Sequence, residues 1–451
     1  MKKILIALIS IILAVFMIAG CTPTGEDDET TTANGGGTTA PGGEENKEIP
    51  KELLEKAVFS SEHFTINGKM TVYLYDYLLS VYYQYYGSYA PYYVTADTVK
   101  SEASELLAFC EAAYAAGEAE LDEDDLKEIS DAVAEMEEAF KQSGYDTLEA
   151  YYGKGVGSET VFEAMKLQYI AVNYSNVKTK EIYDSLAADK DALLTYYNEH
   201  KTLLFGTCYT VTIDDETYFT RLSAATTREE MKAIAAEYAT AKEVSVDSIA
   251  AEKAINYPEL KEGEELTATQ KWLFDGSRKY GDVYADAESK TVYFVILPAV
   301  IRNELLRSAG HILIIPESET EEAKAAAKAK AESLLASYLA GDKTKESFEA
   351  IAKENTKDGN VFYDDIYIGQ MVEPFNDWVY DTARQTGDTG IVETEYGYHV
   401  MYYVGEGELK NYEYFAVSEM YDTKISEFGK SVREACTVTV DSDALKELIE
   451  S

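Results

Sequence analysis

Two short apolar segments, each carrying one histidine, constrain the fold of this chain more than any other feature. Residues 309–314 contain His311, residues 396–403 contain His399, and both segments have the character of short strands. The chain has only four histidines, so two of them at the ends of one unit are informative. Between them, residues 369–375 form a Gly-Gln-Met turn that leads into a helix and presents Met371 and Phe375 together. The pattern predicts a small unit of strands and helices over residues 303–406.

This combination resembles the parvulin family of peptidyl-prolyl cis-trans isomerases, in which two histidines face each other beneath a small apolar proline pocket. The resemblance implies the order strand, helix (321–340, ended by Gly341), helix (345–354), strand, helix (374–384) and closing strands. It also implies that His311 and His399 are catalytic and hydrogen-bonded to each other on adjacent strands. No cofactor and no metal are expected, because a site that holds the proline ring and favours the twisted amide needs neither.

The resemblance assigns the other site residues by motif. Asp358 occupies the position beside the rotating amide, where the family has an Asp or a Cys. The substrate-binding residues are then the apolar pocket pair Met371 and Phe375, the polar lining residues Gln370 and Thr394, and Tyr396, where some members carry a small polar residue.

Each assignment has a structural alternative. A histidine on an apolar strand is often a hydrogen-bonded core residue, and Met371 and Phe375 at the start of a helix are equally suited to a hydrophobic core. Asp358 lies among Lys, Asp and Gly residues, where a solvated turn aspartate is common.

The segment before the Gly-Gln-Met turn departs from the family. Bulky residues fill positions 361–367, where a glycine-rich stretch is usual, and this puts turnover in doubt more than fold. The loop at 316–322 is acidic where phosphate-selective parvulins are basic, so a phosphoserine-proline substrate is not expected.

An internal repeat points to a second, related unit upstream. The pattern W-x-x-D-x-x-R-x-x-G-D occurs at Trp272 and again at Trp378, and these are the only two tryptophans. An apolar strand follows each copy. Aligned in this way, Tyr209 and Tyr293 stand where the second copy has His311 and His399, which predicts a degenerate parvulin-like unit over residues 202–300.

The amino-terminal end has the features of a secretory signal. Lys2 and Lys3 precede an apolar run over residues 4–20, and the run ends at Cys21 in a sequence like a bacterial lipobox. We expect a signal peptide (1–20), lipidation of Cys21 and a disordered tether (21–50) rich in Gly, Thr and Glu. The alternative is an uncleaved anchor, although the run falls short of the ~20 residues of a spanning helix.

The composition limits the partners. A formal charge of −42 argues against nucleic acid and anionic lipid headgroups. It suits basic or unfolded protein clients, or simply keeps the protein soluble. Beyond Cys21 the chain has three widely spaced cysteines, Cys110, Cys208 and Cys436, which give neither a disulfide framework nor metal-ligand spacing. A disulfide between two of the three stays open.

The two ends of the chain are helical by pattern. Residues 51–200 hold a tyrosine-rich helix, with Thr71 as its expected N-cap, and further helices at 99–116, 123–143, 147–152 and 159–198. Residues 407–451 read as helix, strand and helix. These features resemble the PrsA/SurA-like foldases, in which both ends build one helical chaperone domain around inserted parvulin units. The expected fold is therefore α+β.

The leading functional hypothesis is a bacterial, lipid-anchored isomerase and foldase on the extracytoplasmic face of the cell membrane. Its clients would be unfolded or partly folded secreted proteins with X-Pro segments. The first alternative is a non-catalytic holdase chaperone with inactive parvulin units. A second is a lipoprotein that captures small solutes, but the histidine pattern and repeat do not suggest its two lobes. A hydrolase is disfavoured, because no G-x-S-x-G or H-E-x-x-H motif is present.

Overall fold

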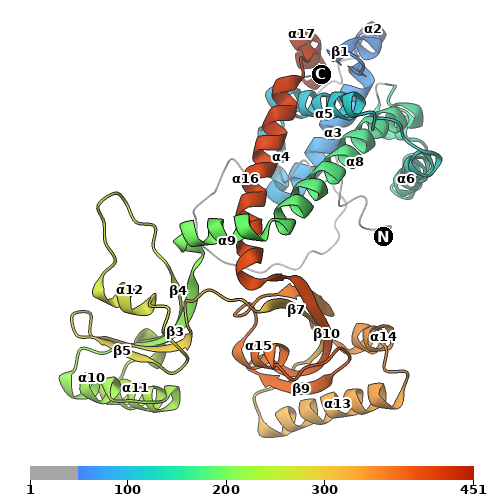
Figure 1. The fold of residues 1–451 in the computed structure, drawn as a ribbon. Helices are drawn as coiled ribbons and strands as arrows, with labels where there is room; N and C mark the ends of the chain where they lie inside the picture. Colours follow the sequence, from blue (N-terminus) through green and yellow to red (C-terminus); the bar gives the residue numbers. More distant parts are fainter. Residues whose placement is uncertain (1–48, 154, 451) are drawn as a thin grey trace. The chain divides into compact units, whose positions relative to one another are not determined.

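A computed structural model describes residues 49–153 and 155–450, and the chain divides into two compact units (Figure 1). Unit 1 combines residues up to Ser185 with Tyr421 onward, and unit 2 spans Leu186–Met420. The predicted signal peptide, Cys21 and residues 21–48 of the predicted tether lie outside the described residues. The mixture of helices and sheets confirms the α+β class.

Unit 1 is mostly helical and contains strands from both ends of the chain. Its small antiparallel sheet has the order β11-β1-β2, and Phe59 of β1 pairs with Val440 of β11. The helices share one core, which includes Phe59, Leu107 and Leu445. The elements are α2 (Lys51–Glu55), β1 (Ala57–Ser60), β2 (Thr65–Asn67), α3 (Gly68–Tyr86), α4 (Ala90–Tyr93), α5 (Ala96–Ala116), α6 (Glu123–Gln142), α7 (Leu148–Tyr152), α8 (Ser158–Ala188), the end of α16 (Asn411–Ala435), β11 (Thr439–Val440) and α17 (Ser442–Ile449).

The tyrosine-rich helix starts earlier than predicted, so the N-cap assignment of Thr71 is wrong. The Asn67 side chain accepts a hydrogen bond from the Met70 amide at 2.9 Å, which makes Asn67 the N-cap of α3. Thr71 is buried, and its hydroxyl donates to the Asn67 carbonyl at 2.8 Å. Gly68 is required at the first position, because a Cβ there would overlap the Leu53 carbonyl.

Unit 2 begins with α9 (Lys190–Glu199) and then holds two four-stranded antiparallel sheets. We call the parts built on these sheets the first module (residues 205–297) and the second module (residues 305–410). The first has the strand order β4-β3-β6-β5 and the second β8-β7-β10-β9. The first module contains β3 (Phe205–Thr212), α10 (Glu216–Ser223), α11 (Arg228–Lys242), β4 (Ala250–Asn256), α12 (Ala268–Leu273), β5 (Val283–Asp286) and β6 (Thr291–Leu297).

The second module follows the predicted order of elements. It contains β7 (Leu305–Ile314), α13 (Glu321–Ala340), α14 (Lys345–Asn355), β8 (Phe362–Ile366), α15 (Glu373–Tyr380), β9 (Thr389–Thr394) and β10 (Gly397–Lys410). Gly341 ends α13 as predicted, whereas α15 stops short of the predicted residue 384.

Side chains of the central strands alternate between two apolar layers. Ile312 and Val400 pack with α13 and α14 on one face, and Ala309 and Met401 pack with α15 on the other. The α15 face is the one that carries the histidines.

Candidate active site

The two histidines of the second module lie side by side on the central strands of its sheet. In the antiparallel register His311 of β7 is opposite Met401, and His399 of β10 is opposite Leu313. The two rings therefore project from the same face as a diagonal pair. Their Nδ1 atoms are 2.8 Å apart, and the rings stack with centroids at 5.1 Å. The predicted hydrogen-bonded pair is confirmed. Both residues are almost fully buried, with exposed fractions of 3% for His311 and 4% for His399.

Asp358 and Thr394 extend this pair at its two ends. The His311 Nε2 atom lies 3.4 Å from Oδ2 of Asp358, and the His399 Nε2 atom lies 2.8 Å from the Thr394 hydroxyl. The backbone amide of Tyr396 donates to the Thr394 oxygen at 3.2 Å. The structure thus brings together three predicted catalytic residues and one predicted lining residue.

The carboxylate sets the direction of the protons along this row of polar contacts, although Nε2 of His311 lies near Asp358 without a hydrogen bond to it. An ionised Asp358 favours the proton on Nε2 of His311, which leaves Nδ1 of His311 as an acceptor. Nδ1 of His399 then donates to it, and Nε2 of His399 accepts from the Thr394 hydroxyl. Every proton has an assigned position without a charge on either ring.

The electrostatics keep both rings neutral and the carboxylate charged. Burial and, after it, the neighbouring His311 lower the pKa of His399 to about 4, while Asp358 opposes the shift. Burial also lowers the pKa of His311, against the attraction of Asp358. For Asp358, partial burial acts to raise the pKa, but hydrogen bonds from the Asn360 amide and the Tyr363 hydroxyl, with the two histidines, outweigh it and lower the pKa.

Tyr363 is a site residue that the sequence did not suggest. It lies on β8 within the bulky 361–367 segment, and its hydroxyl donates to Oδ1 of Asp358 at 3.1 Å. Its ring centroid is 5.5 Å from that of His311. The departure from the family pattern therefore supplies a donor that fixes the carboxylate. No local pattern marks this residue, because the contact depends on how β8 pairs with β7.

The floor of the site is apolar. Phe375 is 2% exposed, and its ring meets both histidine rings edge-on at 5.5 and 5.6 Å. Met371 is partly buried against the same cluster of side chains. Phe375 thus belongs to the hydrophobic core and also contacts the histidine pair. The core interpretation and the site interpretation of this residue are therefore compatible.

Gln370 and Tyr396 lie at the edges of the site. The Gln370 side chain accepts from the Tyr367 amide at 3.0 Å, so it stabilises the turn that presents Met371. Tyr396 follows Thr394 at the tip of the β9–β10 hairpin and is 57% exposed. Their contacts with substrate stay predictions.

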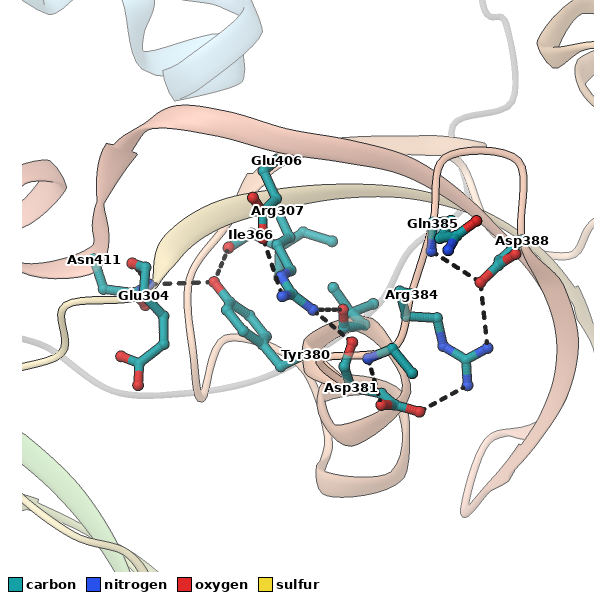
Figure 2. Close-up of polar contacts among 12 residues, drawn as sticks. Glu304, Arg307, Ile366, Tyr380, Asp381, Arg384, Gln385, Asp388, Glu406 and Asn411 are labelled. Atoms are coloured by element: carbon teal, nitrogen blue, oxygen red, sulfur yellow. Dashed lines mark hydrogen bonds and ion pairs between the residues drawn. The ribbon is translucent and has the colours of Figure 1, made fainter.

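Arg307 and Tyr380 anchor the helix that carries Phe375. Arg307 of β7 donates to the carbonyls of Val379 at 2.7 Å and Asp381 at 3.0 Å, which satisfies the C-terminal end of α15. Figure 2 shows Arg307 between Asp381 and Glu406. The other guanidinium nitrogen pairs with Glu406 of β10 at 3.1 Å. The Tyr380 hydroxyl donates to the Ile366 carbonyl at 2.7 Å. The helix is therefore fixed to β7, β8 and β10 together.

The family comparison assigns this module. The model of the PPIC-type PPIase (rotamase) domain matches residues 311–405, which run from the first site histidine past the second. The second module is a parvulin-type rotamase domain. The resemblance read from its motifs is confirmed.

Solved structures with similarity to the chain include three PrsA proteins of Bacillus. Peptidylprolyl isomerase (PrsA) from Bacillus anthracis is 18% identical, over 30% of this chain and 59% of that one, with a TM-score of 0.19. PrsA from Bacillus subtilis is 23% identical, over 32% and 47%, with a TM-score of 0.17. Peptidylprolyl isomerase (PrsA) from Bacillus cereus is 14% identical, over 65% and 93%, with a TM-score of 0.20.

The alignments thus span about half of the first two PrsA chains. A search of curated protein sequences finds no match. The assignment of the rotamase domain therefore rests on the family model and on the site itself.

The first module repeats the tryptophan motif of the rotamase domain in three dimensions. In the rotamase domain the Arg384 guanidinium lies over Trp378 at 4.3 Å and pairs with Asp381 at 3.4 Å (Figure 2 shows the ion pair). In the first module Arg278 lies over Trp272 at 4.7 Å and pairs with the corresponding aspartate at 3.8 Å.

The proposed correspondence of Tyr209 and Tyr293 with the histidines is wrong. Tyr209 is paired with Phe294, so Tyr209 and Tyr293 project from opposite faces of the sheet. A one-residue error in alignment moves a side chain to the other face.

Hydrogen bonds beside the motif give the correct correspondence. The Gly281 amide donates to the Val295 carbonyl and the Gly387 amide to the Tyr403 carbonyl, both at 2.9 Å. These bonds match Val295 with Tyr403. Thr291 and His399 each lie four residues before these positions, so Thr291 corresponds to His399.

The same count along the partner strands gives the other position. Val295 is opposite Cys208 and Tyr403 is opposite Ala309, so Thr210 corresponds to His311. Thr210 donates to the Ala251 carbonyl, and the Thr291 hydroxyl is bonded to that of Thr212. The first module therefore has two buried threonines in place of the histidines of the rotamase domain.

Two further properties concern only the part of the chain described by the structure. No group of three or more His, Cys, Asp or Glu residues is arranged to hold a metal ion there. Within the same residues, no helix combines the length and the apolar character needed to cross a bilayer.

Proposed function

We propose that this protein catalyses cis-trans isomerisation of X-Pro bonds in unfolded or partly folded protein clients. The observation that carries the proposal is the neutral histidine pair with its apolar floor at Phe375 and the ionised Asp358 at its edge. We include in the proposal the catalytic roles of His311, His399 and Asp358, and the binding roles of Gln370, Met371, Phe375, Thr394 and Tyr396.

The chemistry requires no covalent step. Rotation about the amide breaks its resonance against a barrier of ~18–20 kcal/mol, so a site that favours the twisted form accelerates exchange. Met371 and Phe375 hold the proline ring away from water. Asp358, with 28% of its side chain exposed, places negative charge beside the amide oxygen and disfavours the planar, charge-separated form. The neutral histidines fix this carboxylate without cancelling its charge.

The location and clients belong to the same proposal. The apolar run before Cys21 supports a lipid anchor on the extracytoplasmic face of a bacterial membrane, with secreted proteins as clients. An observation in unit 1 supports client binding alongside catalysis. Three strongly exposed rings lie on an uncharged stretch, Tyr85 at 68%, Tyr89 at 67% and Tyr92 at 79%.

The test is an exchange assay on an unphosphorylated X-Pro peptide with the protein from residue 22 onward. Asp358→Asn keeps the shape of the side chain and removes its charge, and we expect kcat/KM to fall roughly tenfold, about 1.4 kcal/mol in the barrier. Asp364→Asn, at an exposed aspartate on the neighbouring strand β8, is the matched control and should retain full activity. A folded protein with no activity above the uncatalysed rate would leave the holdase function, measured by suppression of client aggregation.

A further inference from the structure

We propose that the first module positions the proline pocket of the rotamase domain through an ion pair between Arg228 and Glu373. The inference rests on the proposed isomerase function and assigns Arg228 as a positioning residue for it. Glu373 is the first residue of α15, two positions after Met371 and two before Phe375. A constraint on Glu373 is therefore a constraint on both pocket residues.

The ion pair is short and largely shielded from water. Arg228 is the first residue of α11, and its Nη1 lies 2.7 Å from Oε2 of Glu373 and 3.0 Å from Oε1 of Glu252 on β4. Only 15% of the Arg228 side chain and 30% of the Glu373 side chain are exposed. Solvent screens such a pair less than it screens a surface pair. Glu252 holds the guanidinium on the first module while Glu373 approaches from the second.

Apolar side chains of the first module meet the turn just before Glu373. Gly369 has a φ of +91°, and a Cβ there would lie 2.6 Å from Cδ2 of Leu297 and 3.5 Å from the Phe205 ring. The Tyr367 ring meets that of Phe205 edge-on at 6.0 Å. The backbone of the turn therefore lies directly against the first module, and a side chain at position 369 would force the Leu297 side chain to shift.

The turn takes its own hydrogen bonds from the rotamase domain and from the first residue of α16. The Ile368 amide donates to Asn411 at 2.6 Å, and the Gly369 amide donates to Asn376 at 2.9 Å. These bonds set the shape of the turn, whereas the ion pair and the apolar contact limit its displacement. A module without the histidine pair thus contributes to a site that it does not contain.

A double-mutant cycle on the chain from residue 22 tests the proposal. We expect Arg228→Gln and Glu373→Gln each to lower kcat/KM roughly fivefold, mainly through a higher KM, since the pocket binds the proline ring. The double variant should be no worse than either single variant, and Arg228→Lys should recover part of the loss. Arg221→Gln, which removes an exposed ion pair with Glu237 in the same module and does not touch Arg228, is the control and should leave KM unchanged.

Hydrogen exchange of the Gly369 and Gln370 amides gives a readout that does not need activity. Faster exchange in Arg228→Gln, with intact circular dichroism, is the expected result. Unchanged exchange together with unchanged KM would overturn the positioning role, and so would additive losses in the double variant. If the wild-type protein shows no isomerase activity, the proposed function fails, and the exchange measurement still decides whether Arg228 orders the turn.

Discussion

Replacing His399 by Gln should flatten the dependence of rotamase-domain stability on pH. The folded domain holds His399 with a pKa of about 4, against an ordinary value of 6.5. Between these values the unfolded chain binds the proton and the folded domain does not, so the free energy of unfolding falls as the pH falls. The linkage relation gives a loss of about 2 kcal/mol between about pH 7.5 and pH 5, and about 3 kcal/mol by pH 4.

The measurement is denaturant unfolding followed by tryptophan fluorescence. A Trp272→Phe background leaves Trp378, in the rotamase domain, as the only tryptophan. His311, whose pKa burial also lowers, adds a loss of the same sign that the variant keeps, so the slope should flatten without disappearing. Asp358 does not interfere above pH 5, because its lowered pKa contributes stability that is lost as the pH falls through its ordinary value of 3.8. His200→Gln removes an exposed histidine of the same unit and is the control. Equal losses between pH 7.5 and pH 5 in the wild-type protein and the His399→Gln variant would refute the assigned neutrality of the buried ring.

Three further outcomes follow from individual contacts. Tyr363→Phe removes the hydroxyl donor to Asp358, so the pKa of that carboxyl should rise. The acidic limb of the pH profile of kcat/KM should then move to higher pH. An unmoved limb would contradict the role of Tyr363. Phe375→Ala should destabilise the rotamase domain by roughly 3–5 kcal/mol in thermal unfolding, since the ring is fully packed, and a loss below about 1 kcal/mol argues against that packing. Asn67→Ala should cost unit 1 about 1 kcal/mol in chemical unfolding, whereas Asn67→Asp, which keeps the capping oxygen, should cost far less.

Local patterns predicted those parts of the fold that depend on local chemistry. The spacing of apolar residues and the glycine at 341 gave α13, and the two apolar segments gave the strands that hold His311 and His399. The motif around Met371 and Phe375 placed Phe375 beside the histidine pair and Met371 against the same apolar cluster. Each of these features depends on the spacing of residues that are close together along the chain, and this spacing can be read from the sequence.

The parts that depend on loop length and strand pairing were not predicted. The tryptophan motifs are 106 residues apart, but Thr291 and His399 are 108 apart, because the β5–β6 hairpin is two residues shorter than β9–β10. That difference is what misplaced Tyr293. Contacts such as those of Tyr363 with Asp358 and of Arg228 with Glu373 join distant segments. Nothing near these residues in the sequence indicates their partners.

The pairing of β1 with β11 has a consequence for the order of folding. Phe59 and Val440 are neighbours in one sheet but 381 positions apart in the chain, and the whole of unit 2 lies between them. During synthesis from the amino terminus, all strands of unit 2 emerge before β11 does. Until then β1 pairs only with β2. The edge of β1 that β11 later covers has unpaired backbone groups, and other chains can pair with it. A nascent chain interrupted before β11 would therefore already hold a complete rotamase domain while it still carried an aggregation-prone edge.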